Sequence, residues 1–254
     1  MIFTSGRESV VFNIAYRGEN YALKCYFNRH LPRAERCSFL ADHDPQGLIV
    51  HPHYYCNELW TEQGAVDVAL YKWSEGSSLD WNIRKALHDG NTDRLRQLLR
   101  SFIQLAVGTL EGEWRHGDPK PENIIVRPDG EMIWVDCDAL YAPSLAPSEE
   151  RGTPNWTHPA RQENYDAHID DYSIALLVVS LAALILKPQL FAGECGVAMP
   201  ALGNRHEIAE LLAPYEHLTA LHEALYSQTY IINNLNHKIR CIAHLLPDST
   251  KPPL

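Results

Sequence analysis

One stretch of the chain, HGDPKPENIIVRPDGEMIWVD (residues 116–136), contains polar residues whose types and spacing suit chemistry on phosphate. Asp118, Lys120 and Asn123 lie within six positions, and Asp136 follows 18 residues after Asp118. Phosphoryl transfer from ATP needs an aligned acceptor hydroxyl, metal-bridged phosphates and cations that offset the developing charge. An Asp can accept the hydroxyl proton, a Lys can sit beside the transferred group, and Asn and Asp oxygens suit Mg²⁺. A polar loop with the same letters and no chemistry is the alternative.

The elements around this stretch must bring its four polar residues together. NIIV and EMIWVD flank RPDG, a Pro-Asp-Gly turn, which predicts a β-hairpin over residues 123–136. Such a hairpin folds Asp136 back toward Asn123. Upstream, residues 91–114 have apolar positions at helical intervals and Asn91 or Thr92 as a cap, so a long amphipathic helix is expected to lead into the stretch.

The first third of the chain has the pattern of a β-rich unit. Residues 9–27 form two β-branched and aromatic runs around RGEN, which predicts a hairpin. A short helix is expected at 31–43, and strands at 49–56 and 66–73. The GSS at 76–78 interrupts the pattern and marks the expected boundary between two lobes.

The rest of the chain is predominantly helical in pattern. A helix is expected at 80–90, a long ordered loop at 140–165, and helices from about residue 168. The longest apolar run, residues 174–186, has 13 residues, against the ~20 that cross a bilayer. It therefore predicts a buried helix, and no membrane partner is expected.

Composition limits the classes of partner and compartment. With 254 residues and 45% hydrophobic content, the chain can bury a large core. The net charge of −10 and the lack of a basic run make nucleic acid a poor partner. The six cysteines show no C-x-x-C spacing, and the N-terminus has no signal-peptide pattern. These features predict free thiols and a cytoplasmic protein.

Two other polar groups in the sequence are candidate functional sites. His51, His53 and Cys56 could bind zinc, but no second pair at ligand spacing completes a tetrahedral site, which favours ordinary histidines. Ser144 and Ser148 could be phosphorylated, but they are more simply interpreted as loop residues. Neither group competes with the stretch at 116–136.

The stretch HGDPKPEN resembles the protein-kinase catalytic loop H-R-D-L-K-x-x-N, and VDCD stands where such enzymes have D-F-G. By this resemblance Asp118 is the catalytic base and Lys120 is the loop lysine. Asn123 and Asp136 are the metal ligands, and His116 is a structural residue. The spacing of 18 residues between the two aspartates is the spacing expected in this family.

Upstream matches follow in the order that the family requires. YALKCYF (21–27) is similar to the V-A-I-K strand, which nominates Lys24 to hold the α- and β-phosphates. The preceding SGRESVVF keeps Gly6 of the three expected glycines and has Ser9 in place of the last. Glu35 is nominated as the helix carboxylate that pairs with Lys24; an exposed first-turn Glu is the alternative. Tyr71 and Trp73 lie where the hinge should frame the adenine pocket.

Downstream matches complete the resemblance, which spans about residues 5–186. GTPNWTHPA (152–160) is similar to the end of a kinase activation segment, and Thr153 is expected to contact Asp118 and Lys120. IDDYSIALLVV (169–179) is similar to the start of the central helix of the family, so Asp170 is expected to hydrogen-bond the catalytic-loop backbone.

Three positions depart from the family pattern. Gly117 replaces the Arg of H-R-D, so activity should not need phosphorylation of the activation segment. Ala160 replaces a Glu that forms a structural ion pair. Asp138 replaces the final Gly of D-F-G and could be a further metal ligand. VDCD followed by GTPNWTHPAR is most similar to bacterial kinase-like proteins with a D-Y-D-G version of the motif.

The resemblance implies an α+β, bilobal, protein-kinase-like fold formed by a single domain, residues 1–254. A small antiparallel β-sheet lobe would cover about 1–73 and a mainly helical lobe about 74–254. The implied function is transfer of phosphate from ATP, with Mg²⁺, to Ser or Thr hydroxyls of a protein substrate. Two alternatives remain: a pseudokinase that binds nucleotide or a regulatory partner without catalysis, and a small-molecule kinase of the aminoglycoside type, which shares the HGD sequence.

Overall fold

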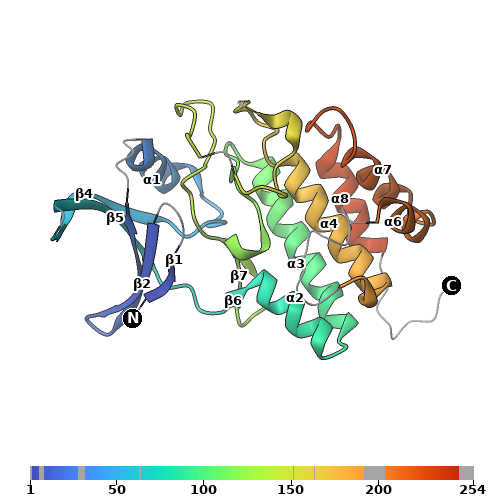
Figure 1. The fold of residues 1–254 in the computed structure, drawn as a ribbon, viewed down its shortest axis with the longest axis horizontal. Helices are drawn as coiled ribbons and strands as arrows, with labels where there is room; N and C mark the ends of the chain where they lie inside the picture. The colour runs from blue at the N-terminus through green and yellow to red at the C-terminus, as the bar shows by residue number, and fades with distance from the viewer. Residues whose placement is uncertain are drawn as a thin grey trace.

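The computed structural model has an α+β architecture, with an antiparallel sheet at one end and a group of helices at the other (Figure 1). It describes residues 2–5, 9–27, 32–62, 64–150, 152–162, 164–191 and 204–245. The arrangement is compatible with a bilobal fold. Gly6, one of the predicted site residues, lies outside the described residues.

The five-stranded sheet has the order β1-β2-β3-β5-β4 and places Lys24 on its central strand. Lys24 on β3 is paired with Val11 on one side and with Ala69 on the other. The strands are β1 (Ile2–Ser5), β2 (Ser9–Tyr16), β3 (Glu19–Tyr26), β4 (Pro52–Thr61) and β5 (Gly64–Lys72). The predicted hairpin over 9–27 is confirmed, and the observed strand β4 extends beyond the expected 49–56.

The turn between β2 and β3 follows from its two residues. Arg17 and Gly18 have φ angles of 51° and 82° and connect Tyr16 to its partner Glu19. Two-residue turns with positive φ at both positions match the right-handed twist of the flanking strands. The turn therefore sets the register that brings Lys24 opposite Val11.

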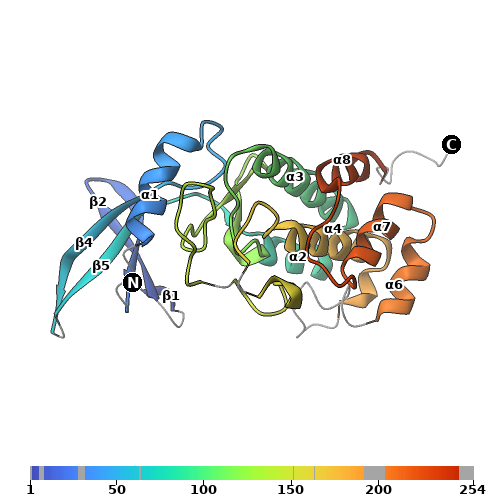
Figure 2. The ribbon, with the colours of Figure 1, turned by 90° about the horizontal axis from the view of Figure 1, so that it is seen from above.

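Helix α1 (Pro32–His43) packs against the sheet and lies beside the loop that follows β8 (Figure 2). The chain then returns to the sheet through Leu48–Val50, which hydrogen-bonds to Trp134 from both sides: the Val50 N–H donates to Trp134 O at 2.9 Å, and the Trp134 N–H donates to Leu48 O at 2.8 Å. This backbone connection joins the five-stranded sheet to the part of the molecule that contains the predicted hairpin.

A small three-stranded sheet pairs the segment that follows β5 with the predicted hairpin. It consists of β6 (Ser77–Ser78), β7 (Ile124–Val126) and β8 (Met132–Trp134), in that order. Ser78 also caps helix α2, because its Oγ accepts the Trp81 N–H at 3.2 Å. The GSS segment that predicted a boundary is therefore a short strand and a helix cap.

The helices surround a nearly continuous apolar core. They are α2 (Leu79–His88), α3 (Thr92–Glu111), α4 (Asp171–Leu186), α6 (Arg205–Leu212), α7 (Glu216–Ala224) and α8 (Leu235–Leu245), with 3₁₀ turns at Pro121–Asn123, Pro159–Arg161 and Pro188–Leu190. Asn91 caps α3. Helix α4 is buried all round and packs on α3, α7 and α8, as a helix that is apolar on every face should.

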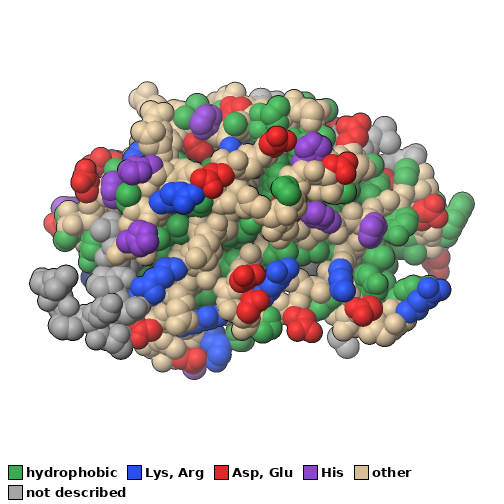
Figure 3. Space-filling model, turned by 180° about the vertical axis from the view of Figure 1, so that it is seen from behind, with side chains coloured by type: hydrophobic (Ala, Val, Ile, Leu, Met, Phe, Trp, Pro, Cys, Tyr) green, Lys and Arg blue, Asp and Glu red, His purple; other side chains and the backbone are tan. Residues whose placement is uncertain are grey.

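The predicted buried helix at 174–186 is confirmed, since it forms most of α4. Within the described ranges, no helix is both long enough and apolar enough to cross a membrane. Figure 3 shows the face opposite to that of Figure 1, where Lys and Arg side chains are interspersed with Asp and Glu side chains.

Candidate active site

The loop that precedes Asp118 is held by one buried carboxylate. Asp170, at the start of α4, is fully buried and accepts the His116 N–H at 2.6 Å and the Gly117 N–H at 2.8 Å. A buried carboxylate needs such donors, and buried N–H groups need an acceptor. The contact predicted for Asp170 is therefore present, and it fixes the backbone immediately before Asp118.

Gly117 occupies a position that only glycine fits. Its φ angle is 85°, and a Cβ atom built there would lie 1.9 Å from the carbonyl oxygen of Ala139. The Arg161 side chain reaches the same loop and donates to Gly117 O at 2.9 Å. Glycine in place of the Arg of H-R-D is thus required by the local backbone.

His116 connects the loop to the strand that leads to Asp136. Its Nε2 donates to Val135 O at 3.0 Å, while its Nδ1 accepts the Asp118 N–H at 3.3 Å, a pair of partners that assigns the proton to Nε2. The ring also packs on Trp134, with centroids 4.7 Å apart. His116 therefore links the loop before Asp118 to the strand that leads to Asp136.

Three predicted residues contact the carboxylate of Asp118, which was also predicted. We call the four together the Asp118 cluster: Asp118, Lys120, Asn123 and Thr153. The Lys120 ammonium lies 2.9 Å from Asp118 Oδ2 and donates to Thr153 Oγ1 at 2.6 Å. Thr153 donates its N–H to Asp118 Oδ1 at 2.7 Å and its hydroxyl to Oδ2 at 3.0 Å. The contact predicted between Thr153 and the other two residues is present, although 33 residues separate Lys120 from Thr153.

Asn123 completes this cluster through its amide group. Its Nδ2 donates to the main-chain oxygen of Asp118 at 3.0 Å and to Oδ2 of the same residue at 3.2 Å. Its Oδ1 has no hydrogen-bond partner among the described residues. The amide is thus oriented with an oxygen that remains available to a hard cation.

The predicted hairpin brings Asp136 next to Asn123. Strands β7 and β8 pair with Ile124 opposite Trp134, and the Val135 N–H donates to Asn123 O at 2.9 Å. Asp136 has a left-handed φ of 70° and a side chain that is 40% exposed. Its Oδ1 accepts from Lys24, and within the described chain its Oδ2 is without a hydrogen-bond donor.

Lys24 is the centre of a second group, which we call the Lys24 cluster: Lys24, Asp136, Asp138, Tyr26 and Arg33. The buried ammonium of Lys24 donates to Asp136 Oδ1 at 2.8 Å and to Asp138 Oδ2 at 2.7 Å. Burial alone would lower the pKa of Lys24, but the two carboxylates outweigh it and raise the pKa above its usual range. Lys24 therefore stays charged.

The same balance holds the pKa of Asp136 low. Burial would raise it, but the attraction and hydrogen bond of Lys24 outweigh burial and lower the pKa of Asp136 to about 2. Asp136 is therefore ionised at neutral pH. An ionised, partly exposed carboxylate and an amide oxygen, on residues that the hairpin backbone brings close together, are oxygen groups of the kind that Mg²⁺ binds.

The predicted pair between Glu35 and Lys24 is wrong. Glu35 is exposed, and the ion pairs of Lys24 among the described residues are with Asp136 and Asp138. The inward stripe of α1 consists of Arg33, Arg36, Cys37 and Leu40, which have the helical spacing i, i+3, i+4, i+7. Glu35 follows Arg33 by two positions, about 200° around the helix, so it faces away from the cluster.

Three side chains near Lys24 were not predicted from the sequence: Arg33 on α1, Tyr26 at the end of β3 and Glu150 in the loop after β8. Arg33 Nε lies 3.6 Å from Asp138 Oδ2, and Arg33 Nη2 donates to Glu150 at 3.1 Å. The Tyr26 hydroxyl donates to Asp138 Oδ1 at 2.9 Å. The spacing of Arg33 and Arg36, three apart and in register with Leu40, was the signal that could have identified the inward face.

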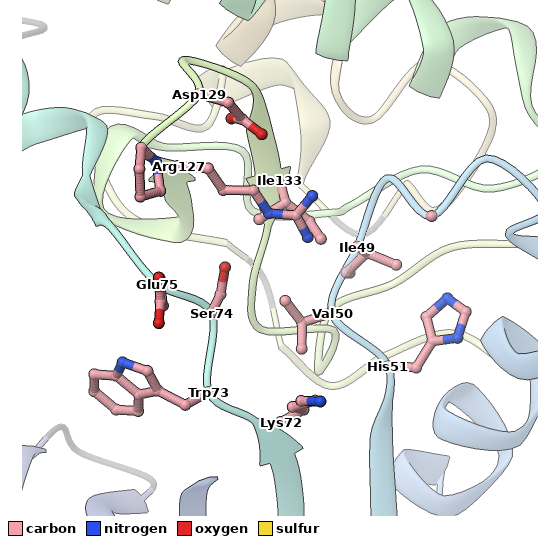
Figure 4. A pocket seen from close by; sticks show the side chains of 12 residues that line it. Ile49, Val50, His51, Lys72, Trp73, Ser74, Glu75, Arg127, Asp129 and Ile133 are labelled. Atoms are coloured by element: carbon pink, nitrogen blue, oxygen red, sulfur yellow. The ribbon is translucent and has the colours of Figure 1, made fainter. Parts of the chain in front are cut away.

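The two predicted hinge residues lie in different surroundings. Tyr71 is buried in a small cluster with Tyr26 and Ala69, and its hydroxyl lies 3.9 Å from Cys137 Sγ. Trp73 lines a pocket of about 650 Å³ (Figure 4). The pocket is lined by residues 49–51, 72–75 and 127–129, with Gly47 and Ile133. It is separate from both polar clusters, because neither Lys24 nor Asp118 lines it.

Two members of the other polar groups, His51 and Ser148, make contacts close to them in the fold. His51 Nε2 pairs with Asp44 at 2.9 Å. No group of three or more His, Cys, Asp or Glu residues that could hold a metal is found in the part of the chain that the structure describes. Ser148 is buried, and its hydroxyl donates to Asp138 O at 3.0 Å.

Comparison with known proteins leaves the site to be interpreted from its own geometry. No protein-family model matches the chain, and no curated protein matches it at a significant level. The arrangement itself combines two lysines, the carboxylates of Asp118 and Asp136, and the side-chain amide of Asn123 in two adjoining polar clusters. These are groups that can orient a hydroxyl, neutralise phosphate charge and hold a divalent cation.

Proposed function

We propose that this protein transfers the γ-phosphoryl group of ATP, with Mg²⁺, to a Ser or Thr hydroxyl of a protein substrate, on a bilobal protein-kinase-like fold. One observation carries the proposal: residues from three separate parts of the chain, around positions 24, 118–136 and 153, converge on two adjoining polar clusters. Each cluster supplies a different requirement of phosphoryl transfer.

The Asp118 cluster supports the acceptor side of the reaction. Asp118 can accept the hydroxyl proton and orient the acceptor oxygen. Thr153 fixes the carboxylate of Asp118 with two hydrogen bonds, and Lys120 lies 2.9 Å from it, where its charge can offset that of the transferred group. The acceptor would thus meet a preorganised base and a cation at the same place.

The Lys24 cluster and Asn123 support the nucleotide side. Asn123 and Asp136 would hold Mg²⁺ through the oxygens that have no donor among the described residues, and the metal would supply positive charge that offsets the charge of the phosphates. The Lys24 ammonium would offset the charge of the α- and β-phosphates. Gly6 and the hinge residues Tyr71 and Trp73 remain predicted contacts of the nucleotide, and a cytoplasmic location remains a prediction.

The proposal is tested by incubating the purified protein with Mg²⁺ and γ-labelled ATP, with itself and a generic protein as acceptors. Wild type should transfer label, and Asp118→Ala and Asp136→Ala should reduce the rate by at least about 100-fold, the range for loss of a catalytic acid–base group. Glu131→Gln is the matched control, because Glu131 is an exposed carboxylate in the same hairpin and does not line the pocket that Trp73 lines. It should retain full activity.

A pseudokinase is the second candidate, and one observation favours it: two carboxylates already occupy the ammonium of Lys24. Absence of label transfer together with an ATP-dependent rise in melting temperature would support a nucleotide-binding scaffold. Absence of both would contradict the proposed enzyme. Transfer to small hydroxylated molecules alone would favour a small-molecule kinase, against which stands the contact of Thr153 with Asp118.

A further inference from the structure

Asp136 and Asp138 are two residues apart but have different surroundings. The side chain of Asp136 is 40% exposed, whereas that of Asp138 is 3% exposed. Asp136 has one oxygen without a donor in the described residues. Both oxygens of Asp138 have partners: Oδ1 accepts from Tyr26, and Oδ2 contacts Lys24 and Arg33.

These surroundings imply different chemistry for the two carboxylates. A buried carboxylate is stable only when donors and opposite charges replace its water. For Asp138 to become a metal ligand, it would have to give up a contact with Lys24, Tyr26 or Arg33 in a buried position. Asp136 can bind a cation through the oxygen that has no donor among the described residues and keep Lys24 on the other.

Asp138 also connects Lys24 to helix α1 through a cation. The Arg33 side chain is 3% exposed, pairs with Asp138, and stacks on the Tyr26 ring with its guanidinium carbon 4.0 Å from the ring centroid. One turn later, Arg36 donates to Leu140 O at 3.0 Å and to Ala146 O at 2.6 Å. Two arginines on one face of α1 thus hold the loop that contains Asp138.

We propose that Asp138 is the positioning residue for Lys24, in place of a helix carboxylate, and that Arg33 makes this positioning depend on the placement of α1. The inference rests on the proposed function for the role of Lys24 toward ATP phosphates. Asp138 is a counter-ion of Lys24 and Arg33, and Asp136 is left to bind the metal. Movement of α1 would take Arg33 away from Asp138, whereas Asp138 itself would stay next to Lys24.

The charges around Lys24 agree with this division. Asp138 contacts two cations, Lys24 and Arg33, whereas the ion pair of Asp136 among the described residues is with Lys24. The buried carboxylate of Asp138 is therefore the better compensated of the two. A divalent cation is attracted to the less compensated and more exposed Asp136.

The first test separates a metal ligand from a positioning residue by Mg²⁺ titration. Asp138→Asn should raise the KM for MgATP roughly tenfold or more, the effect of losing one hydrogen bond between charged groups. It should leave the Mg²⁺ concentration for half-maximal rate unchanged. Asp136→Asn should raise that concentration. A shift in the Mg²⁺ dependence of Asp138→Asn as large as that of Asp136→Asn would overturn the inference.

Variants on α1 provide the matched control. Arg33→Gln should raise the KM for MgATP several-fold, and Arg33→Lys should restore part of the loss because it keeps the charge. Glu35→Gln changes an exposed residue two positions away and should behave as wild type. If Glu35→Gln raises the KM for MgATP as much as Asp138→Asn does, the helix carboxylate positions Lys24 and the inference is wrong.

A double-mutant cycle in the free energy of unfolding tests the inference without any activity. Lys24→Met, Asp138→Asn and the double variant should show coupling, and the cycle of Arg33→Gln with Asp138→Asn should show a smaller coupling. Additive effects in both cycles would overturn the inference even if the protein transfers phosphate. Coupling in a protein that neither binds nucleotide nor transfers phosphate would contradict the proposed function and keep the pairing.

Discussion

The Asp118 cluster and the Lys24 cluster adjoin each other but are held in different ways. The Asp118 cluster follows a loop whose backbone N–H groups are bound by Asp170, and Asp170 belongs to the start of the fully buried helix α4. The Lys24 cluster is held by ion pairs between side chains on a strand, a helix and a loop. The geometry of the Asp118 cluster therefore depends on where the backbone is held, and the geometry of the Lys24 cluster depends on the balance of charges.

This difference indicates how each cluster should respond to change. A loop tied by its backbone has one arrangement, because the donors cannot rotate away from Asp170. Side-chain ion pairs have alternatives, since Arg33 contacts both Asp138 and Glu150. We therefore expect substitutions that release the Asp118 cluster to cause large losses of stability and of label transfer. Substitutions in the Lys24 cluster should cause smaller losses that depend on the charge removed.

The largest effect is expected for Asp170→Ala. Removal of this carboxylate leaves the N–H groups of His116 and Gly117 buried without an acceptor, which should cost about 4 kcal/mol in the free energy of unfolding. Urea denaturation measures this loss, and label transfer should be lost with it. Asp170→Asn keeps one acceptor oxygen and should lose about half as much. Equal stability of wild type and Asp170→Ala would show that the loop has another anchor.

The next effect is expected for Gly117→Ala. The added Cβ would meet Ala139 O at 1.9 Å in a left-handed backbone, so the free energy of unfolding should fall by about 3 kcal/mol. Gly130→Ala is the control, because Gly130 has φ 89° but no atom within 4 Å of the added Cβ. It should cost only about 1 kcal/mol. Similar losses in both variants would mean that the close approach of Ala139 O is unimportant.

The smallest effect is expected from the pH dependence of Glu150. Burial, together with the negative charges of Asp138 and Asp136, raises the pKa of Glu150 to about 7, against the attraction of Lys24 and Arg33. Between pH 4.5 and pH 7 the folded protein therefore holds a proton that the unfolded chain has released. The free energy of unfolding contributed by Glu150 should fall as pH rises through this window.

Melting curves of wild type and Glu150→Gln at several pH values measure this contribution. The stability of wild type relative to the variant should decrease from pH 4.5 to pH 7 and stay constant above it. Asp136, with its pKa lowered to about 2, contributes a change of opposite sign at lower pH, outside this window. A difference between the two proteins that does not vary with pH would show that Glu150 is not buried near these carboxylates.

The parts of the site that the sequence predicted well are those with local or repeated signals. The RPDG turn predicted a hairpin, and β7 and β8 place Asp136 beside Asn123. The apolar run at 174–186 predicted a buried helix, and Asp170 precedes it. In both cases the signal is local in sequence, since turn chemistry and hydrophobic periodicity act over a few residues.

The parts that the sequence did not predict depend on how one element is rotated against another. Glu35 and Arg33 lie in the same turn of α1, and both are charged residues of the kind usually found on an exposed helix face. The sequence alone therefore does not show which of the two faces inward. Which of them faces Lys24 depends on the packing of Cys37 and Leu40 against the core. The restriction at Gly117 likewise depends on Ala139, 22 residues away in sequence.

Local sequence patterns were sufficient to identify the members of the site: an Asp, two lysines, an Asn and a second Asp. Which of these charges are partners depends instead on how the elements pack against one another. A buried ammonium donates to whichever carboxylate the packing brings within hydrogen-bond distance. Here the packing of α1 turns Glu35 outward and brings Asp138 to Lys24 and Arg33.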